Sequence, residues 1–304
     1  MPRISAVIPT RDRRTLVRAA VESALAQDPA PLEVVVVDDG SHDGTADALA
    51  EAFGDAVRVV RARGNGAAAA RNLGAREARG DWVAFLDDDD VWLPGHLARI
   101  AGAIGGTGGR ALAYFDDAAL PAQQGGDTLW ANAGFEPDGD VDLRERPAPW
   151  VLMVRQPLMT PAIVVGRDAY LAAGGMDERL WCREDTHLFL VLGLSGPLCA
   201  VRGVGARVTT EAGPDRLTAT ASATDSPRYW ANTVLLYGDV LERFGPSLTA
   251  TERGELRRRL ATAHWRASRL GWRERRLGVF AVEAARSLRA EPRVVVERFS
   301  GRGH

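Results

Sequence analysis

Residues 80–94 read GDWVAFLDDDDVWLP. The apolar part, residues 82–86, is typical of a buried strand, and four consecutive aspartates, Asp87 to Asp90, follow it directly. Adjacent carboxylates repel one another, and the end of an apolar strand offers little water to screen that repulsion. A bound cation would relieve it, and carboxylate oxygens suit Mg²⁺ or Mn²⁺, which often share their ligands with substrate phosphates. The stretch therefore predicts a divalent-metal site for a phosphorylated ligand; the alternative is an acidic loop open to solvent.

The strand at 82–86 belongs to a regular alternation of strand and helix patterns in the first 115 residues. The predicted strands are 4–9, 32–37, 57–60, 82–86 and 111–115, and the predicted helices are 15–26, 67–78 and 97–104. The run LEVVVV at 32–37 is typical of a strand buried on both faces. This alternation predicts an α/β fold with a mostly parallel sheet and helices on both faces. Ligands of such sheets bind at the carboxyl ends of the strands, so one crevice should hold the aspartates at 38–39 and at 87–90.

The pattern changes after residue 115. Residues 116–150 lose periodicity and gain Gly, Pro and acidic residues, which predicts a long loop or lid. A strand at 160–165 and helices at 167–173 and 188–194 are predicted next. After residue 225 the pattern is helical, with expected helices at 227–244, 250–270 and 273–290. Ser226-Pro227 and a capping box at Thr249 and Glu252 mark two of their starts.

Composition limits the class of protein. The 304 residues are 46% hydrophobic and 26% charged, as in an ordinary globular protein with a large core. No stretch reaches the roughly 20 apolar residues of a membrane span, and the start runs straight into a strand, so we expect no secretory signal and a cytoplasmic location. Cys182 and Cys199 lack CxxC spacing and are expected to be reduced.

The basic residues are unusual in kind and in position. All 38 are arginine, which excludes mechanisms that need a Schiff-base or phosphate-loop lysine. Residues 251–304 contain 14 arginines and 6 glutamates, a net charge of +8, which leaves −10 for residues 1–250. Such a basic segment could bind an anionic membrane surface, an acidic partner or a second copy of the chain. The alternative is that its arginines lie on a solvated helix face. We expect no nucleic-acid partner.

Two turns that follow strands offer polar groups to a ligand. In Asp38-Asp39-Gly40-Ser41 the Asp39 carboxylate could accept hydrogen bonds from a ribose or a base, and a helix cap is the alternative. The segment from Gly64 to Ala69 imitates a GxGxxA dinucleotide motif, but it follows the third strand rather than the first. We therefore expect no dinucleotide site there, although the helix start could assist a phosphate together with Arg71.

Glu184 and Asp185 form a second acidic pair, placed before an apolar run. Two adjacent carboxylates in a cleft do not both ionise easily, so one can have a raised pKa suited to a general base. The alternative is an acidic pair at a helix start, where the helix dipole favours it. His187 is a candidate ligand or positioning group, with a surface histidine as the alternative, and the five histidines show no zinc-binding spacing.

Taken together, these segments resemble the family 2 glycosyltransferases, which have the GT-A fold. The resemblance covers about residues 3–210 and rests on six motifs in order. They are AVIPT (6–10), VVDDGS (36–41), ARNLG (70–74), GDWVAFLDDDDVWLP (80–94), GGMDE (174–178) and Glu184-Asp185. The resemblance implies an enzyme that moves a sugar from a nucleotide donor, most often a UDP-sugar, to an acceptor with inversion. It also implies a catalytic domain over 1–224, with a nucleotide-binding half (1–115) and an acceptor half (116–224), and a helical extension over 225–304.

The resemblance also implies roles for individual residues. Asp87-x-Asp89 matches the DxD motif, in which Asp89, with Asp87, would ligate Mn²⁺ or Mg²⁺. Asp185 matches the proposed catalytic base, with Glu184 in support. The donor-binding positions are Pro9, Thr10, Arg11, Asp39, Asn65, Arg71, Asp87 and Asp88.

Some positions depart from the family pattern. Arg11 replaces a common aromatic residue, Asp12 a common asparagine, and no histidine stands between Thr209 and Arg216 to supply a third metal ligand. A metal-dependent sugar nucleotidyltransferase is one alternative, but it would need a glycine-rich first loop. A non-catalytic sugar-nucleotide-binding relative is another. The sequence does not identify the acceptor, which could be a small molecule, a glycan, or a lipid-linked or carrier-bound group.

Overall fold

The computed structural model describes residues 1–122, 127–209, 226–292 and 294. The chain forms two compact units, one of Met1–Glu178 with Leu188–Gly213, the other of Arg179–His187 with Pro214–His304. The predicted boundary at 224/225 lies outside the described residues. None of the described helices is long and apolar enough to cross a membrane.

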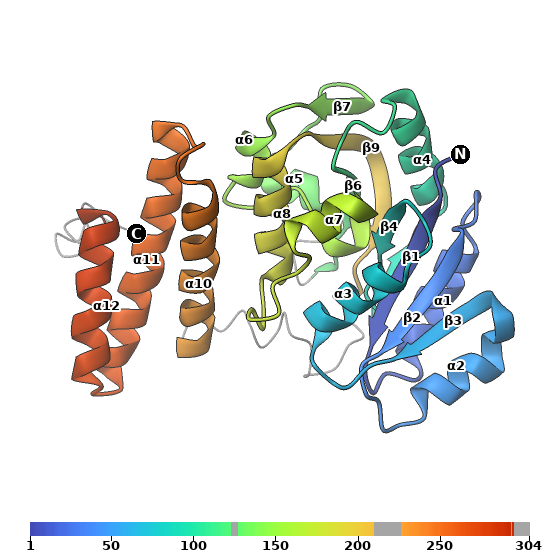
Figure 1. Cartoon of the computed structure of the whole chain (residues 1–304), viewed down its shortest axis with the longest axis horizontal. Coiled ribbons are helices and arrows are strands. Elements are labelled where there is room, and N and C mark those ends of the chain that lie inside the picture. Colours follow the sequence, from blue (N-terminus) through green and yellow to red (C-terminus); the bar gives the residue numbers. More distant parts are fainter. Residues whose placement is uncertain (123–126, 210–225, 293, 295–304) are drawn as a thin grey trace. The chain divides into compact units, whose positions relative to one another are not determined.

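The first unit is built on one sheet (Figure 1). Its elements are β1 (Ile4–Thr10), α1 (Leu16–Leu25), β2 (Glu33–Asp38), α2 (Thr45–Phe53), β3 (Val57–Arg61), α3 (Ala67–Glu77), β4 (Trp82–Phe85), β5 (Val91–Trp92), α4 (His96–Gly106), β6 (Ala113–Ala119), α5 (Leu129–Ala133), β7 (Val141–Arg144), α6 (Ala148–Val151), β8 (Ile163–Gly166), α7 (Arg167–Ala173) and β9 (Leu198–Arg207), with 3₁₀ turns η1 (Gly54–Ala56) and η3 (Thr160–Ala162). Helix α8 (Glu184–Ser195) starts in the second unit and continues into the first.

The sheet combines a parallel and a mixed half. The strand order is β3-β2-β1-β4-β8-β6-β9-β5, and β7 pairs with β9. The first four strands are parallel, as predicted from the alternation. Strand β8 is antiparallel to β4 and β6, while β5 and β7 are antiparallel to β9. The α/β prediction is thus confirmed. Strand β9 was not predicted because its sequence, LCAVRGVGAR, contains two glycines and no alternation.

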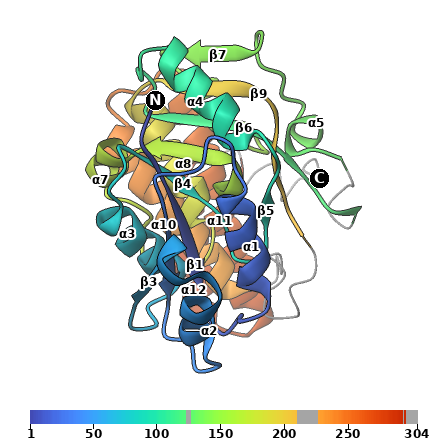
Figure 2. The ribbon, with the colours of Figure 1, turned by 90° about the vertical axis from the view of Figure 1, so that its right-hand side faces the viewer.

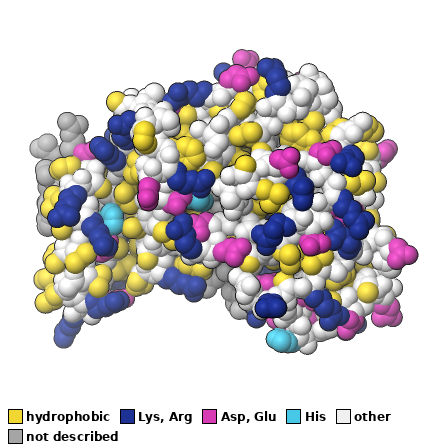
Figure 3. All heavy atoms as spheres, in the orientation of Figure 1, with side chains coloured by type: hydrophobic (Ala, Val, Ile, Leu, Met, Phe, Trp, Pro, Cys, Tyr) yellow, Lys and Arg dark blue, Asp and Glu magenta, His cyan; other side chains and the backbone are white. Residues whose placement is uncertain are grey.

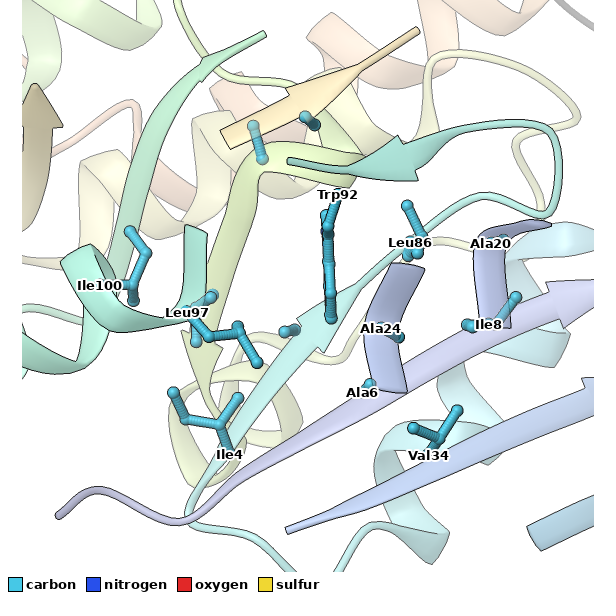
Figure 4. Packing of buried hydrophobic residues seen from close by; sticks show 14 of the residues in the cluster. Ile4, Ala6, Ile8, Ala20, Ala24, Val34, Leu86, Trp92, Leu97 and Ile100 are labelled. Carbon is cyan, nitrogen blue, oxygen red and sulfur yellow. The ribbon is translucent and has the colours of Figure 1, made fainter. Parts of the chain in front are cut away.

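Helices cover both faces of the sheet. Side chains of α1, α2 and α4 pack with one face of β1 and β2, and these three helices lie toward the viewer in Figure 2. Figure 4 shows Trp92 in this core, between Leu97 and Leu86. All residues of β1 are buried, as are the four valines of β2, which fits their β-branched, two-sided pattern.

Helix α3 packs closely on the other face because Gly74 has no side chain. A Cβ at this position would overlap Val7 Cγ1. We expect Gly74→Ala to lower the free energy of unfolding by about 1–3 kcal/mol, since the added methyl overpacks the helix–strand contact. Gly102→Ala in α4 is the control, because its Cβ would meet no atom within 4 Å. The control should stabilise by about 0.5–1 kcal/mol through helix propensity. Urea denaturation measures both, and stabilisation of the Gly74 variant would contradict the described packing.

The prediction that residues 116–150 form a loop or lid is wrong for most of the described part of that segment. The segment continues β6 and contains α5, β7 and α6. Its aromatic residues explain the order: Trp130, Phe135 and Trp150 lie against Phe115 with ring centroids 5.8–6.1 Å apart. These residues are widely spaced among Gly, Pro and acidic residues, so periodicity does not reveal their common core.

The C-terminal helices of the second unit are α10 (Pro227–Phe244), α11 (Ala250–Arg273) and α12 (Leu277–Ala290), close to the predicted ranges. Ser226 caps α10, with a proline at the first turn, and Thr249 and Glu252 form the predicted capping box of α11. Arginines and apolar side chains alternate over the visible face of these helices (Figure 3). Trp272, Leu277, Val282 and Leu288 are exposed.

Candidate functional site

The candidate site lies where three neighbouring parallel strands end. Strand β1 lies between β2 and β4, and all three run in the same direction. Their carboxyl ends carry Thr10, the pair Asp38-Asp39, and the run Asp87 to Asp90. The Asp39 amide donates to the Thr10 carbonyl at 2.8 Å, which holds two of these ends together. The two acidic groups predicted to share one edge of the sheet therefore do so.

Asp88 is the most constrained of the four consecutive aspartates. The Thr10 hydroxyl donates to its Oδ2 and Arg13 donates to its Oδ1, both at 2.7 Å. Burial raises the pKa of the Asp88 carboxyl to about 6, although Arg13 and Thr10 oppose that shift. Both of its oxygens are thus used inside the protein.

Asp89 and Asp90 connect the acidic turn to the end of β9. Asp89 lies 3.3 Å from the Arg13 guanidinium, and its carbonyl accepts the Thr209 hydroxyl. Asp90 is buried and accepts the Thr209 amide at 3.1 Å. Asp90 therefore has a structural role in joining two elements that are far apart in sequence. Residues 210–216, in which no histidine was found to complete a metal site, lie outside the described residues.

Two arginines lie against the acidic run. Arg13 pairs with Asp88 and Asp89, and Arg71 of α3 donates to Asp87 Oδ1. Burial disfavours the charge of Arg13, but Asp88 and Asp89 outweigh burial and raise the pKa of its guanidinium. Arginines of the chain therefore relieve part of the repulsion that we expected a bound cation to relieve. Arg13 was missed in the sequence, where its only signal is the position just after the first strand.

Asp39 binds the turn that precedes α3. Its carboxylate accepts the backbone amides of Gly64, Asn65 and Gly66 at 3.1, 3.0 and 2.7 Å. The Asp39 carboxylate thus takes the anion position at this helix start, which we had expected to assist a phosphate. Close approach of the turns requires Gly40, whose φ is +77° and whose Cβ would lie 3.3 Å from the Gly64 nitrogen.

The first loop is fixed to the turn after β2. Asp12 has a φ of +51°, a left-handed conformation that Asp and Asn adopt more readily than most residues. It accepts the His42 amide at 2.6 Å, and its own amide donates to Ser41 Oγ at 2.8 Å. Asp at this position therefore suits the backbone as well as the common asparagine. Arg11 is exposed beside this loop, whereas Pro9 is buried within β1.

Asn72, in the motif ARNLG (70–74), has a structural function. Its Oδ1 accepts the Tyr170 hydroxyl at 2.6 Å and the Met176 amide at 2.9 Å, and its Nδ2 donates to the Met176 carbonyl at 2.8 Å. Gly175 permits the contact, since its φ is +71° and a Cβ there would overlap Asn72 Oδ1. The GGMDE motif is thus held against α3, and neighbouring Arg71 is held at the acidic turn.

The oxygens of the acidic turn fit a divalent cation. Carboxylate oxygens are the ligands that Mg²⁺ and Mn²⁺ prefer, and the turn brings several to one buried strand end. Asp88 is a poor ligand because both its oxygens already accept hydrogen bonds. Asp87 and Asp89, the two acidic residues expected from the DxD motif to bind the metal, lie on either side of it and could hold the cation.

The acidic pair Glu184-Asp185 belongs to the second compact unit, in the first turn of α8. The helix-start alternative is therefore correct for its position, and it does not exclude a catalytic role. Asp185 Oδ1 accepts the Thr186 amide at 2.5 Å. Arg183, directly before the pair, has a left-handed backbone with a φ of +62°.

Comparison with known proteins finds a family model and relatives that match part of this chain. Residues 5–113 match the family model described as "Glycosyl transferase family 2". An uncharacterized glycosyltransferase of Haemophilus influenzae is 29% identical over 191 residues, 62% of this chain and 61% of that protein. The succinoglycan biosynthesis protein ExoO of Rhizobium meliloti is 40% identical over 101 residues, 33% of this chain and 29% of that protein. This chain thus spans less than two thirds of these relatives.

A solved structure has the same fold. S. aureus TarS 1-349, in complex with UDP-GlcNAc, superimposes with a TM-score of 0.65 over 99% of this chain and 93% of that chain, at 16% identity. The fold is thus the GT-A fold expected from the sequence. The sheet edge and the acidic turn thus lie in a part of the chain, residues 5–113, that matches the model of the family 2 glycosyltransferases.

Proposed function

We propose that this protein transfers a sugar from a nucleotide-diphosphate donor, a UDP-sugar, to a hydroxyl or amine acceptor with inversion at the anomeric carbon. The observation that carries the proposal is the acidic turn Asp87 to Asp90 at the edge where β1, β2 and β4 end, inside the family match. The TarS structure with bound UDP-GlcNAc supports the choice of donor.

The nucleoside is assigned to the edge formed by Thr10 and Asp39. Two carboxylate oxygens offer about four acceptor positions, and backbone amides use three of those on Asp39. One more donor, a base N–H or a ribose hydroxyl, completes the set. Arg11, exposed beside this edge, is positioned to cover the base, and Asn65 lies in the turn that Asp39 holds.

The diphosphate is assigned to Arg71 and the acidic turn. Asp87 and Asp89 would hold Mn²⁺ or Mg²⁺, which when bound supplies positive charge that stabilises the departing diphosphate. Arg71 contributes a second positive charge from α3, and Asp88 keeps Arg13 and Thr10 in place through its two oxygens. The cluster of acids and arginines is thus suited to an anionic ligand that arrives together with a cation.

The acceptor is activated by Asp185 in this proposal. Its carboxylate takes the proton of the acceptor hydroxyl while the acceptor oxygen forms a bond to the anomeric carbon. The bond between that carbon and the diphosphate oxygen breaks on the opposite side, which inverts the configuration. Glu184 supports the base through its charge. The six motifs found in this order support these roles.

A panel of nucleotides and nucleotide sugars tests the proposal. UDP and one UDP-sugar should raise the melting temperature in the presence of Mn²⁺, because ligands that bind only the folded state stabilise it. Stabilisation by ADP or GDP compounds alone would change the nucleotide assignment. No stabilisation by any nucleotide diphosphate would contradict the proposal.

The arginines of α11 are proposed to recruit an anionic or carrier-bound acceptor. Arg258 and Arg259 each pair with Glu255 on the same helix, at 3.3 and 2.8 Å, so part of their charge is already compensated. Changing Arg257, Arg258 and Arg259 to Gln should raise the acceptor KM and weaken its salt dependence, without changing donor hydrolysis. Steady-state kinetics at two salt concentrations measure this. An unchanged KM and salt dependence would leave α11 a solvated helix.

A further inference from the structure

Helix α10 binds the segment that carries the acidic pair at several points. Arg179 and His187, at the two ends of the segment Arg179–His187, bind one carboxylate of α10, that of Asp239. The Arg179 guanidinium donates to Asp239 Oδ1 at 2.9 Å, and His187 Nε2 lies 2.8 Å from Oδ2. These hydrogen bonds lower the pKa of the Asp239 carboxyl against the effect of its partial burial. One side chain of α10 therefore closes the segment as a loop.

The middle of the segment is held through its backbone. The Asn232 side chain accepts the Trp181 amide at 3.1 Å and donates to the Cys182 carbonyl at 2.5 Å. Asn232 is buried, so both backbone groups would lose their partner if its amide were removed. The position of the chain immediately before Arg183 is thus fixed by one residue of α10.

The left-handed residue before the pair is also bound by α10. The Arg183 guanidinium donates to Thr233 Oγ1 at 3.2 Å and to the Tyr237 hydroxyl at 3.1 Å, and it lies over the Tyr237 ring at 5.5 Å. A left-handed backbone is strained for a residue other than glycine, and it persists when the surrounding structure determines it. Here the surroundings are α10, and the constrained residue directly precedes Glu184.

On α10, Thr233 and Tyr237 are four residues apart and Asn232 and Asp239 are seven apart, so each pair lies along one line of the helix surface. We propose that α10 is a positioning element for the acidic pair, in which Asn232, Thr233, Tyr237 and Asp239 set the backbone from which Asp185 acts. The inference rests on the proposed role of Asp185 as the base. It gives a function in catalysis to a helix outside the matched family region.

The test uses the double variant Thr233→Val/Tyr237→Phe, which removes both acceptors of Arg183 and keeps the volume and the ring. Turnover should fall by about 10–100-fold, because small displacements of a catalytic group cost up to about 10²-fold. The UDP–Mn²⁺ melting shift should stay unchanged. Tyr229→Phe on the same helix is the matched control, since among the described residues its hydroxyl makes no hydrogen bond to the segment, and it should keep wild-type turnover. Asn232→Ala is a second variant with the same expectation if it folds.

A double-mutant cycle separates positioning from general damage. In the Asp185→Asn background, Thr233→Val/Tyr237→Phe should cause no further loss, because the base that α10 positions is already absent. An additive further loss, or wild-type turnover of Thr233→Val/Tyr237→Phe in the native background, would overturn the inference. If Asp185→Asn itself keeps full turnover, the assigned base is wrong instead, which is a separate failure of the proposed function.

Discussion

Asp185→Asn should lower turnover by about 10²–10⁴-fold, because the amide keeps the shape of the side chain and cannot accept the acceptor's proton. The carbonyl oxygen of the new side chain can still accept the Thr186 amide, which donates to Asp185 Oδ1 at 2.5 Å in the native protein. The start of α8 should therefore keep its conformation. Affinity for UDP with Mn²⁺, measured by calorimetry, should barely change, so the defect should appear in kcat.

Glu184→Gln is the matched control, since it is the same change one residue away. It should reduce turnover much less than Asp185→Asn. An inactive Glu184 variant together with an active Asp185 variant would reverse the two roles. Full activity of both variants would mean that another group deprotonates the acceptor.

Asp89→Ala should abolish the metal-dependent part of UDP binding. In the native protein, UDP with Mn²⁺ should raise the melting temperature more than either alone, because the cation joins two anionic partners. Without Asp89, Mn²⁺ should no longer add to the rise in melting temperature that UDP causes. The melting temperature without ligand should change little. Asp88 retains its hydrogen bonds to Arg13 and Thr10 in this variant.

Asp90→Ala separates metal binding from folding. The Asp90 carboxylate accepts the Thr209 amide, so its loss should cost about 1–3 kcal/mol of unfolding free energy. The increment from Mn²⁺ and UDP should nevertheless remain. If UDP raises the melting temperature equally in a chelator and in Mn²⁺, metal-assisted binding is contradicted. If the Mn²⁺-dependent rise disappears in Asp90→Ala but not in Asp89→Ala, the metal has been assigned to the wrong aspartate.

The parallel half of the fold was predictable because its signals are local. The valine run of β2 and the apolar stretch before Asp87 each identify a buried strand without reference to the rest of the chain. Strands β5 and β7, with two and four residues, are too short to show a period, and both depend on β9 for their pairing. Residues 127–150 were misjudged for the same reason, since their order comes from aromatic contacts between distant positions.

The candidate site, too, could be predicted only in part from the sequence. The acidic turn, Thr10, Asp39 and Arg71 were named from the sequence, and the structure brings them to one edge of the sheet. The partners Arg13 and Thr209 were not, because an arginine in a loop and a threonine after an unrecognised strand carry no signal of their own. The role of Asp90 also needed the structure, since four consecutive aspartates look alike in sequence, whereas the structure shows that Asp90 accepts the Thr209 amide.

The most direct measurement is the identity of the products formed from the nucleotide sugar that stabilises the protein. Incubated with Mn²⁺, the protein should release UDP, and the release should stop when a chelator removes the metal. Release of free UDP requires cleavage of the bond between the sugar and the diphosphate, which is the reaction proposed for the acidic turn and Asp185. Formation of UTP from pyrophosphate, or of a nucleoside monophosphate, would show cleavage within the diphosphate and contradict sugar transfer. A bound donor that yields no UDP with any acceptor would contradict it as well.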